Sequence, residues 1–343
     1  MPYKDKYGNL LWAVEDGFTN EFIEAMYPAP QLPKIPTMDK KLIIEACIPG
    51  WQPVKWYRER GIQNLPPITV EGQAQAIADC VKAGASIIHT HPINQETGIA
   101  EVFAPKLLAE ILDRAFDKVG DFVTMNHAWI WDHDKSPYID YISDAREILE
   151  VGKGNKYLQG SVIMTWGAHH YGECEHGGSP FLEGMKWLEE HDVKPIYQMH
   201  MYRFMRIKRE LFDSGVSKWK PYVINIHTGK HEDEQIDIDP WGQIETIKNI
   251  YMIRETLGND ARIGIYPGGR NWLPIVVQGI MQGVEIVRTG IEDQFWLWPH
   301  RDEISTYASQ TTEMVATIAQ TLGRELATPA EAREILGMKL TSK

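Results

Sequence analysis

The feature that most restricts the fold of this chain is a repeated alternation of short apolar runs with longer stretches of helical periodicity. The short runs are rich in Val, Ile and aromatic residues, as buried strands are. The predicted strands are Leu42–Ile48, Ser86–Ile93, Phe122–Ala128, Ser161–Gly167, Lys194–Met201, Tyr222–Thr228, Ala261–Pro267 and Gly283–Asp293. The helices predicted between them are Val70–Ala83, Pro105–Val119, Tyr141–Val151, Pro180–Glu190, Tyr202–Phe212, Gln243–Leu257 and Trp272–Met281.

Eight strand–helix units are the number in a closed (β/α)8 barrel, which usually takes about 250 residues. An open, doubly wound sheet would show the same alternation, but no Gly-rich dinucleotide motif follows the first strand. We therefore predict an α/β protein with a (β/α)8 TIM barrel at residues 41–301. Residues 1–40 are expected to form an N-terminal extension or arm. Residues 302–343 are expected to form C-terminal helices (Glu303–Leu322 and Thr328–Leu336) that pack on the barrel or on a neighbouring subunit.

Composition excludes several classes of protein. The 343 residues include 35 Lys and Arg against 47 Asp and Glu, a formal net charge of −12 that argues against a nucleic-acid partner. No apolar stretch approaches the roughly 18–20 residues that a membrane span needs. The three cysteines stand in no metal or redox spacing, and the first nine residues lack the apolar core of a secretion signal. We expect a cytoplasmic protein that binds neither nucleic acid nor a membrane.

Two of the predicted strands carry residues suited to a metal site. His89 and His91 are two residues apart, so their side chains project to the same side of the strand. Together they could bind a divalent metal, although a hydrogen-bonded pair of core histidines would have the same spacing. In a closed barrel, strands two and eight both flank strand one, so Glu292 could complete a His₂–Glu ligand set. Arg288 could hold a carboxylate, or it could form a structural pair with Asp293.

Other polar residues stand at or near strand ends, and each alone is a weak signal. They are Glu45, Asn126, Thr165, Gln198, His200 and His227. The segment Pro-Gly-Gly-Arg at 267–270 follows the seventh strand, where barrels often hold phosphate.

At these residues the sequence resembles the β-keto acid cleavage enzymes, the family typified by the 3-keto-5-aminohexanoate cleavage enzyme. The resemblance extends from about Lys41 to Lys339 and is weakest between Trp129 and Asp260. The stretches that carry it are residues 65–69 (LPPIT), 83–91 (AGASIIHTH), 288–293 (RTGIED) and 323–337 (GRELATPAEAREILG).

The resemblance implies a barrel with one zinc ion per chain that assembles as a homo-oligomer, usually a tetramer, with a dimer as the alternative. It implies a transferase with a small-molecule substrate, in which a β-keto acid and acetyl-CoA give acetoacetate and an acyl-CoA by a retro-Claisen exchange. The family's zinc ligands carry over onto His89, His91 and Glu292. Its catalytic arginine and aspartate carry over onto Arg288 and Asp293.

Several positions depart from the family pattern. A family glutamate that holds a substrate amino group aligns with Gln52, and one on strand five aligns with Gln198. The family's strand-three serine aligns with Asn126, and a Pro-Gly-Gly loop after strand six is replaced by residues 227–232 (HTGKHE). Glutamine cannot neutralise an ammonium group, so we expect a neutral or anionic keto acid. The residues expected to bind it are Gln52, Asn126, Trp129, Thr165 and Gln198.

Three alternatives remain open at the level of sequence. The first is hydrolytic cleavage of a C–C or C–N bond without coenzyme A, in which zinc activates water and His200 or His227 relays a proton. The second is an iron(II) oxygenase that uses the same ligand set. The third is a non-catalytic metal-binding or metabolite-binding protein, against which Arg288 and Asp293 argue.

Overall fold

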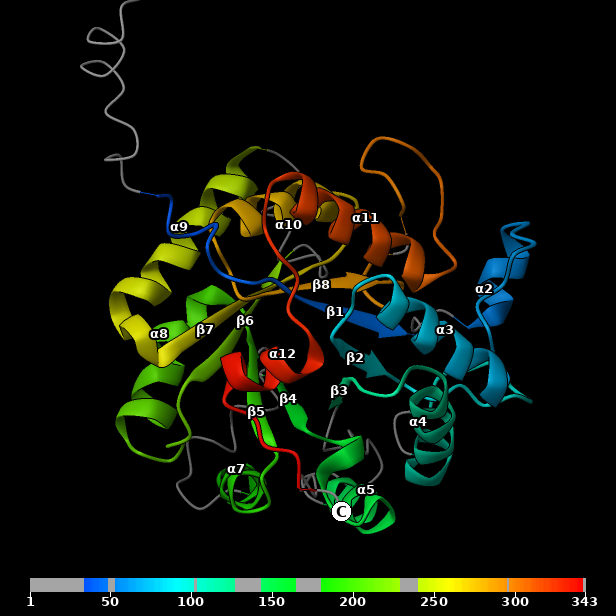
Figure 1. Ribbon diagram of the computed structural model, residues 1–343, viewed down its shortest axis with the longest axis horizontal. Coiled ribbons are helices and arrows are strands. Elements are labelled where there is room, and N and C mark those ends of the chain that lie inside the picture. Colours follow the sequence, from blue (N-terminus) through cyan, green and yellow to red (C-terminus); the bar gives the residue numbers. More distant parts are fainter. Residues whose placement is uncertain are drawn as a thin grey trace, which may run out of the picture. The chain divides into compact units, whose positions relative to one another are not determined.

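Eight parallel strands form a closed barrel in sequence order, which confirms the predicted (β/α)8 TIM-barrel fold (Figure 1). The structure is a computed structural model in which residues 34–48, 53–101, 104–126, 143–164, 180–228, 240–294 and 296–341 are described. The strands are β1 (Ile43–Ile48), β2 (Ile87–Thr90), β3 (Val123–Asn126), β4 (Gly160–Met164), β5 (Lys194–Met199), β6 (Tyr222–Thr228), β7 (Ala261–Pro267) and β8 (Ile286–Gly290). Pairing of β1 with β8 closes the barrel and sets Glu45 beside Arg288.

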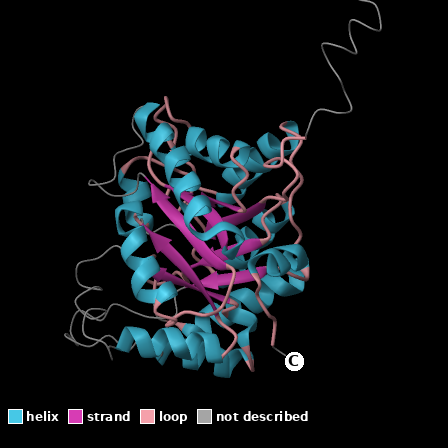
Figure 2. Cartoon of the chain, turned by 90° about the vertical axis from the view of Figure 1, so that its left-hand side faces the viewer, coloured by secondary structure: helices cyan, strands magenta, loops and turns pink. Residues whose placement is uncertain are grey.

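Helices surround the strands (Figure 2). They are α2 (Val54–Glu59), α3 (Val70–Lys82), α4 (Pro105–Val119), α5 (Ser143–Gly152), α7 (Pro180–Glu190), α8 (Phe204–Ile207), α9 (Pro240–Leu257), α10 (Trp272–Met281), α11 (Ala308–Thr321) and α12 (Pro329–Leu336). Thr69 caps α3 by accepting a hydrogen bond from the Gly72 amide. None of the helices in the described residues combines the length with the apolar composition that a membrane span requires.

The helix predicted over Tyr202–Phe212 is broken into three pieces. A 3₁₀ turn (Met201–Arg203) leads into the short α8, which continues as a π-helical turn (Lys208–Asp213). The wider π turn allows Leu211 and Phe212 both to be buried, and Phe212 stacks on Tyr222 with ring centroids 4.0 Å apart. Packing against the barrel therefore overrides the regular helical period here.

The helix predicted to begin at Glu303 begins five residues later, at Ala308, so that boundary was wrong. Ile304 pairs with Trp296 in an antiparallel bridge. The Leu297 amide also donates to the Glu303 carbonyl. These contacts keep the chain extended before α11.

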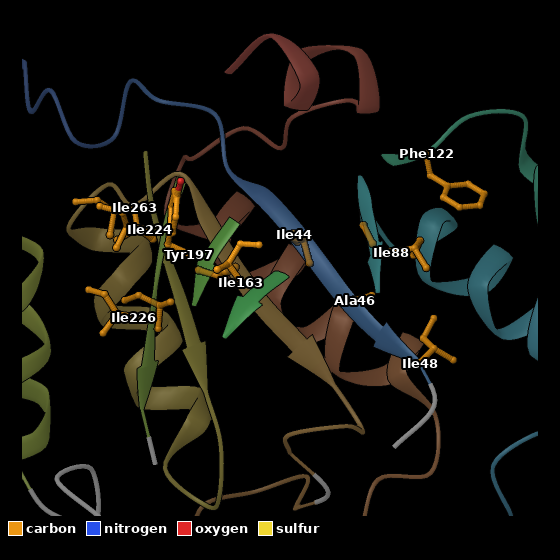
Figure 3. Packing of buried hydrophobic residues seen from close by; sticks show 14 of the residues in the cluster. Ile44, Ala46, Ile48, Ile88, Phe122, Ile163, Tyr197, Ile224, Ile226 and Ile263 are labelled. Carbon is orange, nitrogen blue, oxygen red and sulfur yellow. The ribbon is translucent and has the colours of Figure 1, made fainter. Parts of the chain in front are cut away.

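Alternation along the strands creates two separate cores. On β1, Ile44, Ala46 and Ile48 face the surrounding helices (Figure 3). The opposite side chains fill the barrel interior together with residues of the C-terminal segment, namely Ile43, Ile87, Val123, Met125, Val162, Ile196, Val223, Tyr266, Ile286, Ala327, Ala332, Leu336 and Met338.

Helix α12 closes the amino-terminal end of the barrel. Thr328 and Glu331 form a capping box at its start. Arg333 donates to both carboxylate oxygens of Asp121, at 2.8 and 2.7 Å, just before β3 begins. Because this end of the barrel is filled and covered, the polar side chains of the interior lie toward the carboxyl ends of the strands.

Candidate metal centre and its surroundings

The two histidines of β2 and the first carboxylate after β8 converge near the carboxyl ends of the strands. Nε2 of His89 lies 3.1 Å from Nε2 of His91 and 3.2 Å from Oε2 of Glu292. Nε2 of His91 lies 3.7 Å from Oε1 of Glu292. All three side chains are buried. Within the described parts of the chain, they are the one group of three His, Cys, Asp or Glu side chains arranged as metal ligands.

A hydrogen bond determines which nitrogen of His89 can bind a metal. Nδ1 lies 2.7 Å from the carbonyl oxygen of Met125, which can only accept, so Nδ1 carries the proton. Burial lowers the pKa of His89 to about 4 although Glu292 opposes this shift, so the ring is neutral at pH 7. Its Nε2 lone pair therefore faces a carboxylate oxygen of Glu292, and a cation between the two would relieve their repulsion.

The spacing of the three side chains suits zinc. With bonds of about 2.0–2.2 Å, ligand atoms around a tetrahedral zinc ion lie roughly 3.3–3.6 Å apart. The three distances between ligand atoms here are 3.1, 3.2 and 3.7 Å. Two imidazoles and one carboxylate are also a donor set that zinc accepts.

A glycine allows the chain to turn after β8 and bring Glu292 toward β2. Gly290 has a φ of +123°, which favours glycine over any residue with a side chain. A Cβ atom at this position would lie 2.4 Å from the carbonyl oxygen of Cys47 on β1. Gly290 is therefore required both for its backbone conformation and for its close approach to β1.

The guanidinium of Arg288 contacts three carboxylates, one through each nitrogen. Nε donates to Asp293 at 2.6 Å, Nη1 to Glu45 at 3.2 Å and Nη2 to Glu292 at 2.8 Å. Burial acts to lower the pKa of Arg288, but the carboxylates, with Asp293 foremost, hold it well above its usual value. Burial likewise acts to raise the pKa of Glu292, but Arg288 holds it well below its usual value. Arg288 thus connects Glu292 to Asp293.

Glu45 and Tyr266 form a buried pair beside Arg288. The sequence indicated Glu45 only as a polar residue at a strand end and did not indicate Tyr266. The Tyr266 hydroxyl donates to Oε2 of Glu45, and the Tyr266 ring lies 4.7 Å from Cζ of Arg288. Burial raises the pKa of Glu45 to about 7, although Arg288 and the Tyr266 hydroxyl oppose the rise. Inward alternation from Ile43 together with the pairing of β1 and β8 could have placed Glu45 beside Arg288, but neither signal points to Tyr266 on β7.

The charges at this site favour a divalent cation. Among the described residues, three buried carboxylates, on Glu45, Glu292 and Asp293, surround the guanidinium of Arg288. With all three ionised, the cluster carries two excess negative charges in an environment where unbalanced charge is costly. A divalent ion held by the three ligands would balance them.

The polar residues predicted on strands five and six also come together. The rings of His200 and His227 stack with centroids 5.4 Å apart and planes 16° apart. Gln198 pairs in register with Asn225. These two residues precede His200 and His227 by two positions, so they lie nearer the amino-terminal end of the barrel. All four side chains are buried. They stand on the side of the barrel opposite β1 and β2, because strand order in a closed eight-stranded barrel sets β5 across from β1.

The other residues expected to bind substrate have different positions. Asn126 accepts a hydrogen bond from the Thr90 amide at 2.9 Å and donates to the Tyr157 carbonyl at 3.5 Å. Its side chain therefore connects β2 to the segment before β4. A role of Asn126 in substrate binding stays a prediction. Gln52, Trp129 and Thr165 lie outside the described residues.

The Pro-Gly-Gly-Arg segment at 267–270 uses its polar groups within the protein. The Gly268 amide donates to the Thr228 carbonyl at 2.7 Å, and the Gly269 amide donates to the Asp293 carbonyl at 3.2 Å. Arg270 binds Asp302 and lies with its Cζ 3.7 Å from the centre of the Trp296 ring. The segment therefore supports the position of Asp293.

Fold and site together define a (β/α)8-barrel enzyme with its polar site at the carboxyl ends of the strands, where such barrels carry their chemistry. Comparison with known protein families identifies the family to which this enzyme belongs. Residues 41–130 and 159–338 match the beta-keto acid cleavage enzyme family, and the chain belongs to this family. The resemblance found in the sequence is thereby confirmed.

Curated relatives agree with this assignment. The chain is 23% identical to the 3-keto-5-aminohexanoate cleavage enzyme of Fusobacterium nucleatum over 308 residues, which cover 88% of this chain and 100% of the relative. It is 33% identical to the 3,5-dioxohexanoate:acetyl-CoA acetone transferase of Paraburkholderia graminis over 82 residues, which cover 24% of this chain and 26% of the relative.

Solved structures agree in fold. The apo structure of ObcA superposes with a TM-score of 0.61 at 10% identity, covering 79% of this chain and 65% of that chain. The ternary complex of ObcA with a C4-CoA adduct and oxalate superposes with a TM-score of 0.56 at 11% identity, covering 79% of this chain and 67% of that chain.

Proposed function

We propose that this protein is a zinc-dependent transferase that cleaves a β-keto acid in a retro-Claisen exchange with acetyl-CoA. The CH₂–COO⁻ unit of the keto acid passes to the acetyl group and forms acetoacetate. The remaining acyl group passes to the coenzyme A sulfur and forms an acyl-CoA. The observation that carries the proposal is the convergence of His89, His91 and Glu292 with the Arg288–Asp293 pair at the carboxyl ends of the barrel strands.

Each residue of this group has a defined task. His89, His91 and Glu292 would hold one zinc ion per chain, and bound zinc supplies the Lewis acidity that polarises a keto oxygen. Asp293 is the general base and acid at the carbon that loses and gains protons, and the hydrogen bond from Nε of Arg288 orients its carboxylate. Within the described structure, three of the five N–H groups of Arg288 bind protein carboxylates, and a bidentate contact with a substrate carboxylate would use the other two.

The use of acetyl-CoA is supported by comparison. The Paraburkholderia graminis relative is named for a transfer that involves acetyl-CoA. ObcA, which shares the fold, is described in complex with a C4-CoA adduct. The proposal also keeps Gln52, Asn126, Trp129, Thr165 and Gln198 as residues that contact the keto acid.

Calorimetry and product analysis test the proposal together. Purified protein, analysed for metal and freed of loose zinc, is titrated with acetyl-CoA and then incubated with β-keto acids. We expect saturable binding, about one zinc per chain, and equal amounts of acetoacetate and acyl-CoA formed only when acetyl-CoA is present. Zinc-loaded protein that neither binds acetyl-CoA nor forms acyl-CoA would contradict the proposal.

Hydrolytic cleavage without coenzyme A is the second candidate. The observation that favours it is the stacked pair of His200 and His227, whose imidazoles could relay a proton to or from water. Cleavage of a C–C or C–N bond in the absence of acetyl-CoA, with incorporation of labelled oxygen from water, would select this candidate.

We further propose that the protein is a homo-oligomer. The segment after β5 exposes two large apolar side chains, with Tyr202 71% exposed and Met205 57% exposed. A second copy of the chain would cover such side chains. Light scattering after size-exclusion chromatography is expected to give the mass of a tetramer or dimer, and a monomer mass would contradict the proposal.

A further inference from the structure

The inner face of β5 and β6 carries polar side chains that the metal centre does not use. Ile196 of β5 and Val223 of β6 both belong to the core inside the barrel. Alternation therefore points Gln198 and His200 inward on β5, and Asn225 and His227 inward on β6. His200 keeps an extended backbone, with φ −80° and ψ 133°, so the alternation of β5 continues to it.

Strand register places His200 and His227 in a row of inward-facing side chains that continues to Arg288. His227 pairs with Tyr266, and Arg288 pairs with Glu45. Tyr266 and Arg288 each follow by two residues the paired positions Gly264 and Ile286. A single inward-facing layer thus contains, in strand order, His200, His227, Tyr266, Arg288 and Glu45. A molecule bound at the metal centre on β2 and β8 would extend toward the histidines across the carboxyl-end mouth of the barrel, where (β/α)8 barrels bind their ligands.

The inward-facing side chains of β5 and β6, here called the β5–β6 wall, include a polar group that could bind a ligand, the amide of Asn225. Its side chain is fully buried, and within the described structure neither its amide nitrogen nor its oxygen has a hydrogen-bond partner. The side chain lies over Gly264, where an added Cβ would meet Oδ1 of Asn225 at 1.9 Å. A buried polar group in this condition is costly unless something binds it. The glycine opposite it provides the room that its inward position needs.

The composition of the wall indicates which chemical group it would bind. The described residues of β5 and β6 include no carboxylate, so an ammonium group would find no counter-charge there. The amide groups of Gln198 and Asn225 and the imidazoles of His200 and His227 can all donate hydrogen bonds. A carboxylate, with two oxygens and about four acceptor positions, matches this set of donors.

We infer that His200 and His227, together with Asn225 and Gln198, form a subsite for a second carboxylate at the far end of the substrate. The preferred substrate would then be a β-keto dicarboxylic acid. Its β-keto acid end would lie at the metal centre and Arg288, and its terminal carboxylate at the two histidines. This inference rests on the proposed function for the reaction but not for the binding of the second carboxylate.

The test compares three β-keto acids of similar size that differ in the group at the end far from the metal centre. Turnover is measured with 3-oxoadipate, 3-oxohexanoate and 5-amino-3-oxohexanoate, which end in a carboxylate, an alkyl group and a chain bearing an ammonium group. Binding of the unreactive pair adipate and hexanoate is measured separately by calorimetry. We expect 3-oxoadipate to have the highest kcat/KM and adipate to bind more tightly than hexanoate, each by roughly 10- to 100-fold, as for hydrogen bonds to a charged group.

Substitutions then assign the preference to the histidines. His200→Phe and His227→Phe keep an aromatic ring but lose the donors, and each is expected to remove most of the preference for adipate and 3-oxoadipate. His227→Gln, which restores a donor, is expected to regain part of it. His191→Phe, at an exposed histidine stacked on Trp187, serves as the control. Zinc content and circular dichroism verify that each variant folds.

The outcomes separate the subsite from the proposed reaction. If adipate binds no better than hexanoate, or if the phenylalanine variants leave the preference unchanged, the subsite is overturned whatever the turnover. If adipate binds through the two histidines but no keto acid is cleaved, the subsite stands and the proposed function fails. A higher kcat/KM for the ammonium or alkyl tail would also overturn the subsite while leaving the retro-Claisen reaction in place.

Discussion

Nε of Arg288 donates to Oδ2 of Asp293 at 2.6 Å, while Nη2 of the same guanidinium contacts the neighbouring residue, Glu292, at 2.8 Å. The adjacent carboxylates of Glu292 and Asp293 are thus both paired with the planar, rigid guanidinium of Arg288. Arg288, on β8, therefore sets the distance between the proposed acid–base group, Asp293, and the proposed metal ligand, Glu292. Both carboxylates lie in the turn that follows β8.

Replacement of Asp293 by Asn is expected to reduce kcat by about 100- to 10,000-fold. The amide oxygen can still accept the hydrogen bond from Arg288, but the side chain can no longer take a proton. Zinc content should stay at the wild-type level because Asp293 is not a ligand. Steady-state kinetics with metal analysis checks this, with Asp117→Asn on the exposed face of α4 as the control. An unchanged kcat would remove Asp293 from the reaction.

Replacement of His89 by Ala is expected to lower the zinc content from about one per chain to a small fraction of that and to abolish activity. Two donors would remain, and the hydrogen bond from Nδ1 to the Met125 carbonyl would be lost as well. Elemental analysis after dialysis measures the metal. His191→Ala, an exposed histidine, is the matched control. An active enzyme with no zinc would show that the reaction does not need this centre.

Replacement of Gly290 by Ala is expected to lower both stability and metal affinity. The new Cβ would collide with the Cys47 carbonyl oxygen, and relief of that contact moves the turn that carries Glu292. Gly120→Ala is an instructive control, because its φ is also positive, at +87°, but nothing lies within 4 Å of an added Cβ. Urea unfolding should show a cost of about 1–3 kcal/mol at Gly120 and a larger one at Gly290, where zinc affinity should also fall. Equal effects at the two glycines would argue against the close approach to β1.

Glu45 is expected to make the metal-free protein less stable as pH rises. Its pKa is about 7 in the folded protein against 4.5 as the ordinary value, so the folded state binds more protons between these values. The free energy of unfolding therefore falls as pH increases from about 4.5 to 7, by an amount on the order of 3 kcal/mol.

The Glu45→Gln variant lacks the titrating carboxyl, so its stability has no contribution from this proton. Urea unfolding of the chelator-treated proteins at pH 5 and pH 8 measures the contribution as the difference between wild type and variant. We expect the variant to gain stability relative to wild type at pH 8. A difference that does not depend on pH would mean that Glu45 is ionised throughout the range.

The barrel and the convergence of His89, His91 and Glu292 could be predicted from the sequence, because strand and helix patterns are local and the order of strands in a closed barrel follows from their count. The β6 strand (Tyr222–Thr228) and the α4 helix (Pro105–Val119) have the predicted bounds, since their apolar periodicity coincides with their burial. His89 and His91 share a face through simple alternation, and Glu292 joins them because β2 and β8 both flank β1 in a closed barrel.

The remaining features depend on contacts between distant segments. The role of Glu45 requires the register of β1 against β8 and the hydroxyl of Tyr266 on β7. The break in the helix after β5 depends on where Phe212 meets the barrel. The hydrogen bonds of Asn126 to the Thr90 amide and the Tyr157 carbonyl likewise depend on tertiary packing. None of these relationships leaves a local signature in the sequence.

The position of α12 has a consequence for how the protein is made. The core inside the barrel is completed by Ala332, Leu336 and Met338, and β1 finds its second neighbour only when β8 has been formed. During synthesis β1 therefore keeps one edge unpaired until β8 has left the ribosome, and the amino-terminal end of the barrel stays open until α12 has done so. Unpaired strand edges and exposed apolar surface make a nascent chain prone to aggregation. The chain is thus expected to depend on chaperones during translation more than a protein built from early-folding local units.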